Sequence, residues 1–253
     1  MIRFQEWCNE TEETLLKHKL RRLSADPAKQ VQAVDMLAKA VPDYYAEPGR
    51  VAQLLKKLGK VAAAEYVEQK LPTKTNIRSG DLGEILCTAY VHEATPFNLG
   101  IQRLRWKDHR NMSMRGEDVL AFGLSGKSGS LKILKAEVKS AATMSSTIIG
   151  KAREALSANS GLPSPHAISF VADRLNESGD TILGGALDEA QLKDGIKPAQ
   201  VSHMLFTFSG NDPSKPLKKN LQAYAGSVQQ YYVALCVTTH QTFIKEVFEA
   251  VIV

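Results

Sequence analysis

The chain has 253 residues, of which 43% are hydrophobic and 23% are charged, a composition typical of one large globular domain or two modest ones. No segment approaches the ~18 consecutive apolar residues of a membrane span, and the acidic segment 1–16 is unlike a secretory signal peptide. Three distant cysteines, at positions 8, 87 and 236, favour reduced thiols in a cytoplasmic protein over a disulfide framework. The net charge of +5 permits nucleic-acid binding but is common among unrelated proteins.

Residues 1–74 are predicted to be all helical. Residues 26–41 begin with Asp26 as a candidate N-cap and Pro27 at the first helical position. The amphipathic segments 50–59 and 61–71 follow, and 72–76 has the composition of a connector. The sequence therefore predicts a helical N-terminal region, 1–74, ahead of a second domain, 75–253.

The second part of the chain changes from helical to strand patterns. Residues 78–95 have apolar side chains near helical spacing. Strands are predicted at 101–106, 117–124 and 130–140, and the turn 125–129 predicts a hairpin between the last two. The remaining predicted elements are a helix at 146–160, strands at 202–210 and 231–239, and a closing helix at 240–252. The overall pattern is helical first and mixed α/β afterwards.

Residues 121–128, AFGLSGKS, match a loose phosphate-loop pattern with Ala121 in place of the first glycine. Phosphate binding by such a loop requires a following helix, whose N-terminal amides face the phosphates. Here the loop leads into a predicted strand. We therefore interpret the segment as a hairpin turn, and an ATP-binding function is disfavoured.

The segment 131–140, LKILKAEVKS, ends an apolar strand with Glu137 and Lys139. Side chains two residues apart in a strand point to the same face. Such a pair is often no more than a surface ion pair. However, Asp118 begins the preceding strand, and a hairpin turning at 125–129 would place it beside Glu137. Two neighbouring carboxylates repel each other unless a cation or a proton lies between them, and Mg²⁺ favours such oxygen ligands.

Glu84, in the predicted helix 78–95, would add a third acid from a neighbouring element. An ordinary exposed helical glutamate is an equally good interpretation of this residue from the sequence.

These residues together resemble the PD-(D/E)XK nuclease superfamily. Glu84 lies on a helix, Asp118 starts a strand, and the sequence EVK (137–139) lies on the next strand. More narrowly, RSGDLGEIL, RGEDVLAF and LKAEVKS resemble the HamA family, the nuclease subunits of Hachiman antiphage defence systems. The resemblance implies an α/β (α+β) fold in which a restriction-endonuclease-like core has a mixed central sheet flanked by helices.

The resemblance also implies a function and a site. Asp118, Glu137 and Glu84 would bind Mg²⁺ or Mn²⁺, with the backbone carbonyl of Val138 as a further ligand. Lys139 would orient the attacking water and stabilise charge on the phosphate. The family implies DNA as substrate and a helicase partner resembling HamB. Two alternatives stay open: a stand-alone restriction or repair endonuclease, and a catalytically silent DNA-binding regulatory subunit.

Overall fold

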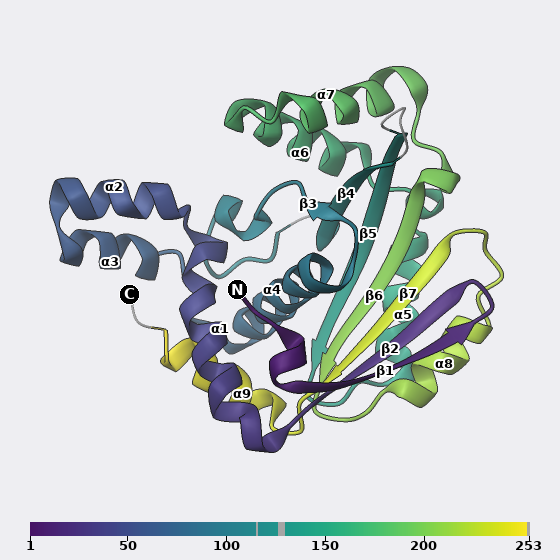
Figure 1. Cartoon of the computed structure of the whole chain (residues 1–253), viewed down its shortest axis with the longest axis horizontal. Helices are drawn as coiled ribbons and strands as arrows, with labels where there is room; N and C mark the ends of the chain where they lie inside the picture. The colour runs from purple at the N-terminus through teal and green to yellow at the C-terminus, as the bar shows by residue number, and fades with distance from the viewer. Residues whose placement is uncertain (115, 126–129, 252–253) are drawn as a thin grey trace.

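The computed structural model describes residues 1–114, 116–125 and 130–251. In this part of the chain seven strands form one sheet in the order β1-β2-β7-β6-β5-β4-β3 (Figure 1). The strands are β1 (Cys8–Leu15), β2 (His18–Ala25), β3 (Asn98–Leu99), β4 (Val119–Ser125), β5 (Ser130–Ala141), β6 (Val201–Ser209) and β7 (Gln229–Cys236). Strands β2, β7, β6 and β5 are parallel, whereas β1 at one edge and β4 and β3 at the other pair antiparallel. The predicted mixed sheet in a mixed α/β fold is confirmed.

Helices cover both faces of this sheet. The α-helices are α1 (Gln30–Tyr45), α2 (Pro48–Leu58), α3 (Lys60–Glu68), α4 (Thr75–Ala94), α5 (Ser146–Ser157), α6 (Pro165–Ser178), α7 (Thr181–Glu189), α8 (Ser214–Gln222) and α9 (His240–Glu249). Helices α1, α4 and α9 pack on one face, and α5 and α8 pack on the other. Helices α6 and α7 cover the end of the second face near β4.

Alternating side chains on the central strands supply the two cores. In β5, Leu134, Ala136 and Val138 are buried with α4, whereas Leu131 and Ile133 are buried with α6. Because successive strand residues point to opposite faces, the same alternation places Glu137 on the face opposite Val138. The apolar residues of β5 that precede Glu137 and Lys139 therefore pack against helices on both faces of the sheet.

The N-terminal region is not all helical, and this prediction is wrong for residues 8–25. They form the β1–β2 hairpin, and β2 pairs in parallel with β7 from the far end of the chain. The residues of β1 are almost all exposed, as suits an edge strand, so the sequence shows no apolar alternation there. Helices α1, α2 and α3 agree with the predicted segments, and Asp26 caps a short 3₁₀ turn ahead of α1. The domain boundary at residue 74 stays a prediction.

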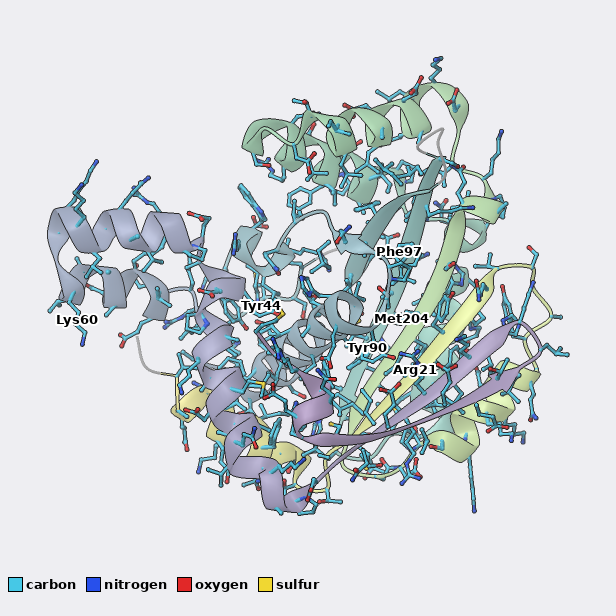
Figure 2. All side chains as sticks on the ribbon, in the orientation of Figure 1. Arg21, Tyr44, Lys60, Tyr90, Phe97 and Met204 are labelled. Atoms are coloured by element: carbon cyan, nitrogen blue, oxygen red, sulfur yellow. The ribbon has the colours of Figure 1, made fainter. Side chains whose placement is uncertain are left out.

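Helices α2 and α3 pack on each other as a hairpin that projects from the body of the molecule (Figure 1). No residue of α2 is buried, and Lys60 lies at the outer end of the projection (Figure 2). Glu47 caps α2 by accepting hydrogen bonds from the amides of Gly49 and Arg50.

The predicted strand at 101–106 is also wrong. Residues Arg103–Trp106 form a 3₁₀ turn, and β3 comprises only Asn98–Leu99. The sequence further missed α6, α7 and α8. In contrast, β4 and β5 pair antiparallel as predicted, although residues 126–129 of their connection lie outside the described residues. A strand follows the AFGLSGKS segment, which lacks the helix that a phosphate loop requires.

Among the described residues, no helix combines the length and the apolar composition that crossing a bilayer requires.

Candidate active site

Asp118 lies immediately before β4, at the end of the β4–β5 hairpin opposite the connection between the two strands. Val119 pairs with Ala136, so the antiparallel register brings Asp118 beside Glu137. The Oδ2 atom of Asp118 accepts a hydrogen bond from the backbone N–H of Val138 at 2.7 Å. The predicted adjacency of the two acids is therefore confirmed.

Glu137 and Lys139 lie on one face of β5, as their spacing predicts. The Lys139 ammonium donates a hydrogen bond to the Glu137 carboxylate. The side chains of Lys139 and Glu137 are 31% and 15% exposed, respectively. This ion pair is therefore only partly screened by water, and its lysine keeps access to solvent.

Glu84 comes from α4, which packs closely against β5. A Cβ atom at the neighbouring Gly83 would lie 3.0 Å from Cγ1 of Val138, so a side chain there would have to displace Val138 slightly for α4 to stay this close. The side chain of Glu84 is 15% exposed, and its Oε2 lies 3.8 Å from Nη1 of Arg103. The interpretation of Glu84 as an ordinary exposed glutamate is therefore wrong.

The three acids have raised pKa values. Burial is the main cause for each, because it disfavours the charged form. It raises the pKa of Glu84 to about 8, with the negative charge of Asp118 as the next cause. Burial and then the charge of Asp118 raise the pKa of Glu137, while the bond from Lys139 opposes the rise. Asp118 is thus the electrostatic link between the acid on α4 and the acid on β5.

The Val138 amide and nearby cations limit the rise in the pKa of Asp118. Arg103, from the 3₁₀ turn between β3 and β4, is one of them, and its Nη1 donates to the backbone carbonyl of Asp118 at 3.0 Å. Sequence reasoning missed Arg103 because the segment 101–106 was predicted to be a strand. The segment's two arginines, followed directly by Lys107 and near an acidic motif, are a signal that could have found it.

A second missed group lies one turn before Glu84 on α4. Asp81 accepts hydrogen bonds from Lys107 at 2.6 and 2.9 Å and from the hydroxyl of Tyr45 at 2.7 Å. The side chains of Lys107 and Asp81 are only 4% and 5% exposed. Asp81 and Glu84 are three residues apart, which places them on the same side of α4. The buried ion pair therefore ties the segment after β3 to the helix that carries Glu84.

Glu117, next to Asp118, fixes the other side of the site. Its carboxylate accepts hydrogen bonds from the amide and the hydroxyl of Ser164, the N-cap of α6. The buried Lys135 lies 4.0 Å from Glu117 and donates to the backbone carbonyls of Leu156, Ala158 and Leu162. These bonds connect the start of β4 to the helices on the second face of the sheet.

Glu84, Asp118 and Glu117 line a cavity of about 440 Å³ between α4, α6 and the segment before β4. Trp106, Met112 and Phe170 are among its apolar lining residues. Tyr44 lies on the α1 side of this cavity and is labelled in Figure 2. The acids therefore adjoin a space large enough for a small ligand or part of a polymer.

The donor set fits a hard divalent cation, because carboxylate oxygens are the ligands that Mg²⁺ prefers. Within the described ranges, however, no three His, Cys, Asp or Glu side chains converge closely enough to hold a metal ion. Each acid is instead directed to a protein group: Glu84 to Arg103, Asp118 to the Val138 amide, and Glu137 to Lys139. Joint binding of one metal would require the acids to exchange these partners.

Comparison with known proteins identifies the family. A family model described as HamA matches residues 1–251 of the chain. The chain is also similar to the Hachiman protein HamA of Bacillus cereus, with 25% identity over 253 residues, 97% of this chain and 89% of that protein. The family match extends over both the predicted N-terminal region and the sheet that carries the acids. The chain therefore belongs to the HamA family.

Proposed function

We propose that this protein is a metal-dependent deoxyribonuclease that acts as the effector of a Hachiman antiphage defence system. The observation that carries this proposal is the position of Asp118, whose charge raises the pKa of both Glu84 and Glu137. Buried acids that repel one another beside a lysine suit a site that gains stability by taking up a divalent cation. Membership of the HamA family supports the role in defence.

In this proposal the three carboxylates hold Mg²⁺ or Mn²⁺, with the Val138 carbonyl as a further ligand. The ion would lower the pKa of a coordinated water and neutralise charge on a DNA phosphate. Lys139, released from Glu137, orients the attacking water and stabilises the negative charge that develops on the phosphate oxygens. Arg103 holds the backbone of Asp118 and balances the charge of Glu84.

The proposed partner is a helicase subunit resembling HamB. This part of the proposal is supported by family membership alone. The Bacillus cereus relative is named as a protein of the Hachiman system. A helicase that moves on DNA would present the strand to this site and restrict cleavage to DNA on which it is engaged.

A second candidate is a catalytically silent DNA-binding subunit. It is favoured by the ion pairs that Glu84 and Glu137 make with Arg103 and Lys139, which compensate these acids without a metal. Such a subunit would bind DNA in the absence of divalent ions and never cut it.

Supercoiled plasmid incubated with the purified protein and Mg²⁺ or Mn²⁺ tests the proposal, first alone and then with the helicase and ATP. Cleavage that EDTA abolishes, and that Lys139→Ala and Glu137→Ala lose, is the expected result. Removal of one group that stabilises developing charge costs ~2.7–4 kcal/mol in the barrier, roughly 10²–10³-fold in rate. A matched control is Lys193→Ala, an exposed lysine paired with Glu189 away from the site, which should cut normally. If the plasmid stays intact both with the protein alone and with the helicase and ATP, the catalytically silent DNA-binding subunit is favoured.

A further inference from the structure

The cavity beside the acids has a chemical character of its own. Its volume of about 440 Å³ lies within the range of roughly 300–1,000 Å³ that is usual for small-ligand sites. Asp118 and Glu84 line it together with aromatic and thioether side chains, among them Trp106, Phe170 and Met112. The apolar part is therefore continuous with the acids that the proposed function assigns to phosphodiester cleavage.

The charges of the lining disfavour a phosphate inside this cavity. Without a bound metal ion the Asp118 carboxylate would repel it, and Glu84, with a pKa of about 8, supplies no positive charge to offset this. The charge of Lys107 is taken up by Asp81, and that of Arg103 lies beside Glu84. A neutral planar group is better suited, because an uncharged ring is not repelled and can pack on the aromatic and apolar lining.

Trp106 supplies a surface on which such a group can stack. The guanidinium carbon of Arg174 lies 4.5 Å from the centroid of the Trp106 ring, and Phe170 contacts the ring edge-on at 6.5 Å. These contacts hold the ring in place, yet Trp106 remains 43% exposed. A fixed, partly exposed aromatic ring is the usual platform for an unstacked nucleobase.

We propose that this cavity binds one unstacked nucleobase of the substrate strand, stacked on Trp106, next to the phosphate held at Asp118. This inference rests on the proposed function, since it places a base of the cleaved strand in the cavity. It also narrows the substrate class. A base can enter the cavity only from a single strand, an unpaired strand end or a locally opened duplex.

Two tryptophans allow a direct test, because Trp7 is 1% exposed and Trp106 is the one open to a ligand. Tryptophan emission is measured in the Glu137→Ala protein with Mg²⁺, so that cleavage does not disturb binding. The probes are a short single-stranded oligonucleotide, a blunt duplex of the same sequence, and the corresponding free mononucleotides. Quenching by the single strand at far lower concentration than by the other two is expected.

Variants provide an independent readout through the anisotropy of labelled single-stranded DNA. Loss of one base–aromatic stack corresponds to roughly 5- to 150-fold weaker binding, which we expect for Trp106→Leu but not for Trp106→Phe. Leu192→Ala, which changes a residue 78% exposed and outside the cavity lining, should bind normally. If Trp106→Leu does not fold, the comparison of the three probes in the protein that retains Trp106 decides the question.

The inference is overturned if blunt duplex or free mononucleotides quench emission as strongly as the single strand. It is also overturned if folded Trp106→Leu binds as tightly as Trp106→Phe. Its failure is distinguishable from failure of the proposed function. Binding of single strands through Trp106 by a protein that never cuts DNA would support the cavity assignment and refute the nuclease.

Discussion

Replacing Glu84 with glutamine should stabilise the protein, and increasingly so as the pH rises. Burial and Asp118 raise the pKa of Glu84 from 4.5 to about 8 in the folded protein. The folded state therefore holds a proton that the unfolded chain releases above about pH 4.5. The stability from this proton is complete below that pH and is lost as the pH rises through about 8. Glutamine stays neutral and avoids the loss.

The size of the effect follows from the pKa difference. The interval from 4.5 to about 8 corresponds to about 5 kcal/mol at 1.36 kcal/mol per pH unit, which is a ceiling. Glutamine also loses the attraction between Glu84 and Arg103, 3.8 Å away. We therefore expect the advantage of Glu84→Gln to grow by about 1–3 kcal/mol between about pH 5 and about pH 8.

Urea unfolding at both pH values, with EDTA present, measures this free-energy difference. The matched control is Glu154→Gln, which changes an exposed glutamate on α5 and should alter stability by less than about 0.5 kcal/mol. An advantage of Glu84→Gln that is the same at both pH values, or a variant less stable than the wild type near pH 8, would refute the electrostatic reasoning.

Three other predictions concern packing, the buried ion pair and metal binding. Gly83→Ala should lower stability by about 1–3 kcal/mol, because its Cβ would lie 3.0 Å from Val138. Gly80→Ala on the same helix is the control: its Cβ would meet nothing within 4 Å, so it should raise stability by about 0.5–1 kcal/mol. Equal melting temperatures for Gly83→Ala and Gly80→Ala would contradict the close packing of α4 on β5. Asp81→Asn should cost about 3–5 kcal/mol in urea unfolding, because it leaves the charge of Lys107 buried, and a loss below 1 kcal/mol would contradict this assignment. Mg²⁺ should raise the melting temperature more near pH 8 than near pH 6, since at pH 8 fewer protons compete with the ion for the carboxylates. A rise independent of pH would argue against binding at these acids.

The hairpin with its two acids could be predicted because the information is local. β4 and β5 are antiparallel neighbours in the chain, and their register alone brings Asp118 beside Glu137. Their spacing likewise places Glu137 and Lys139 on one face. The sequence made Glu84 a candidate third acid but left an exposed glutamate equally plausible, because its burial depends on how closely Gly83 lets α4 approach β5.

The remaining parts depend on contacts between distant segments. β2 is a strand because it pairs with β7, about 200 residues later, and β1 is an exposed edge strand without apolar alternation. The segment with Arg103 and Lys107 has the residue types of a strand, but its side chains bind the acids and backbone of α4 and β4 instead. Tertiary pairing thus overrides the local pattern in both places.

The central claim is that the acids around Asp118 form a metal site and not merely a cluster of ion pairs. Calorimetric titration with Mn²⁺ near pH 8, comparing the wild type with Asp118→Asn, tests it most directly. Asparagine can still accept the hydrogen bond from the Val138 amide, so the local structure should persist. We predict that the wild type binds the ion and that Asp118→Asn binds it at least roughly tenfold more weakly. Equal binding by the two proteins, or none by the wild type, would contradict the account.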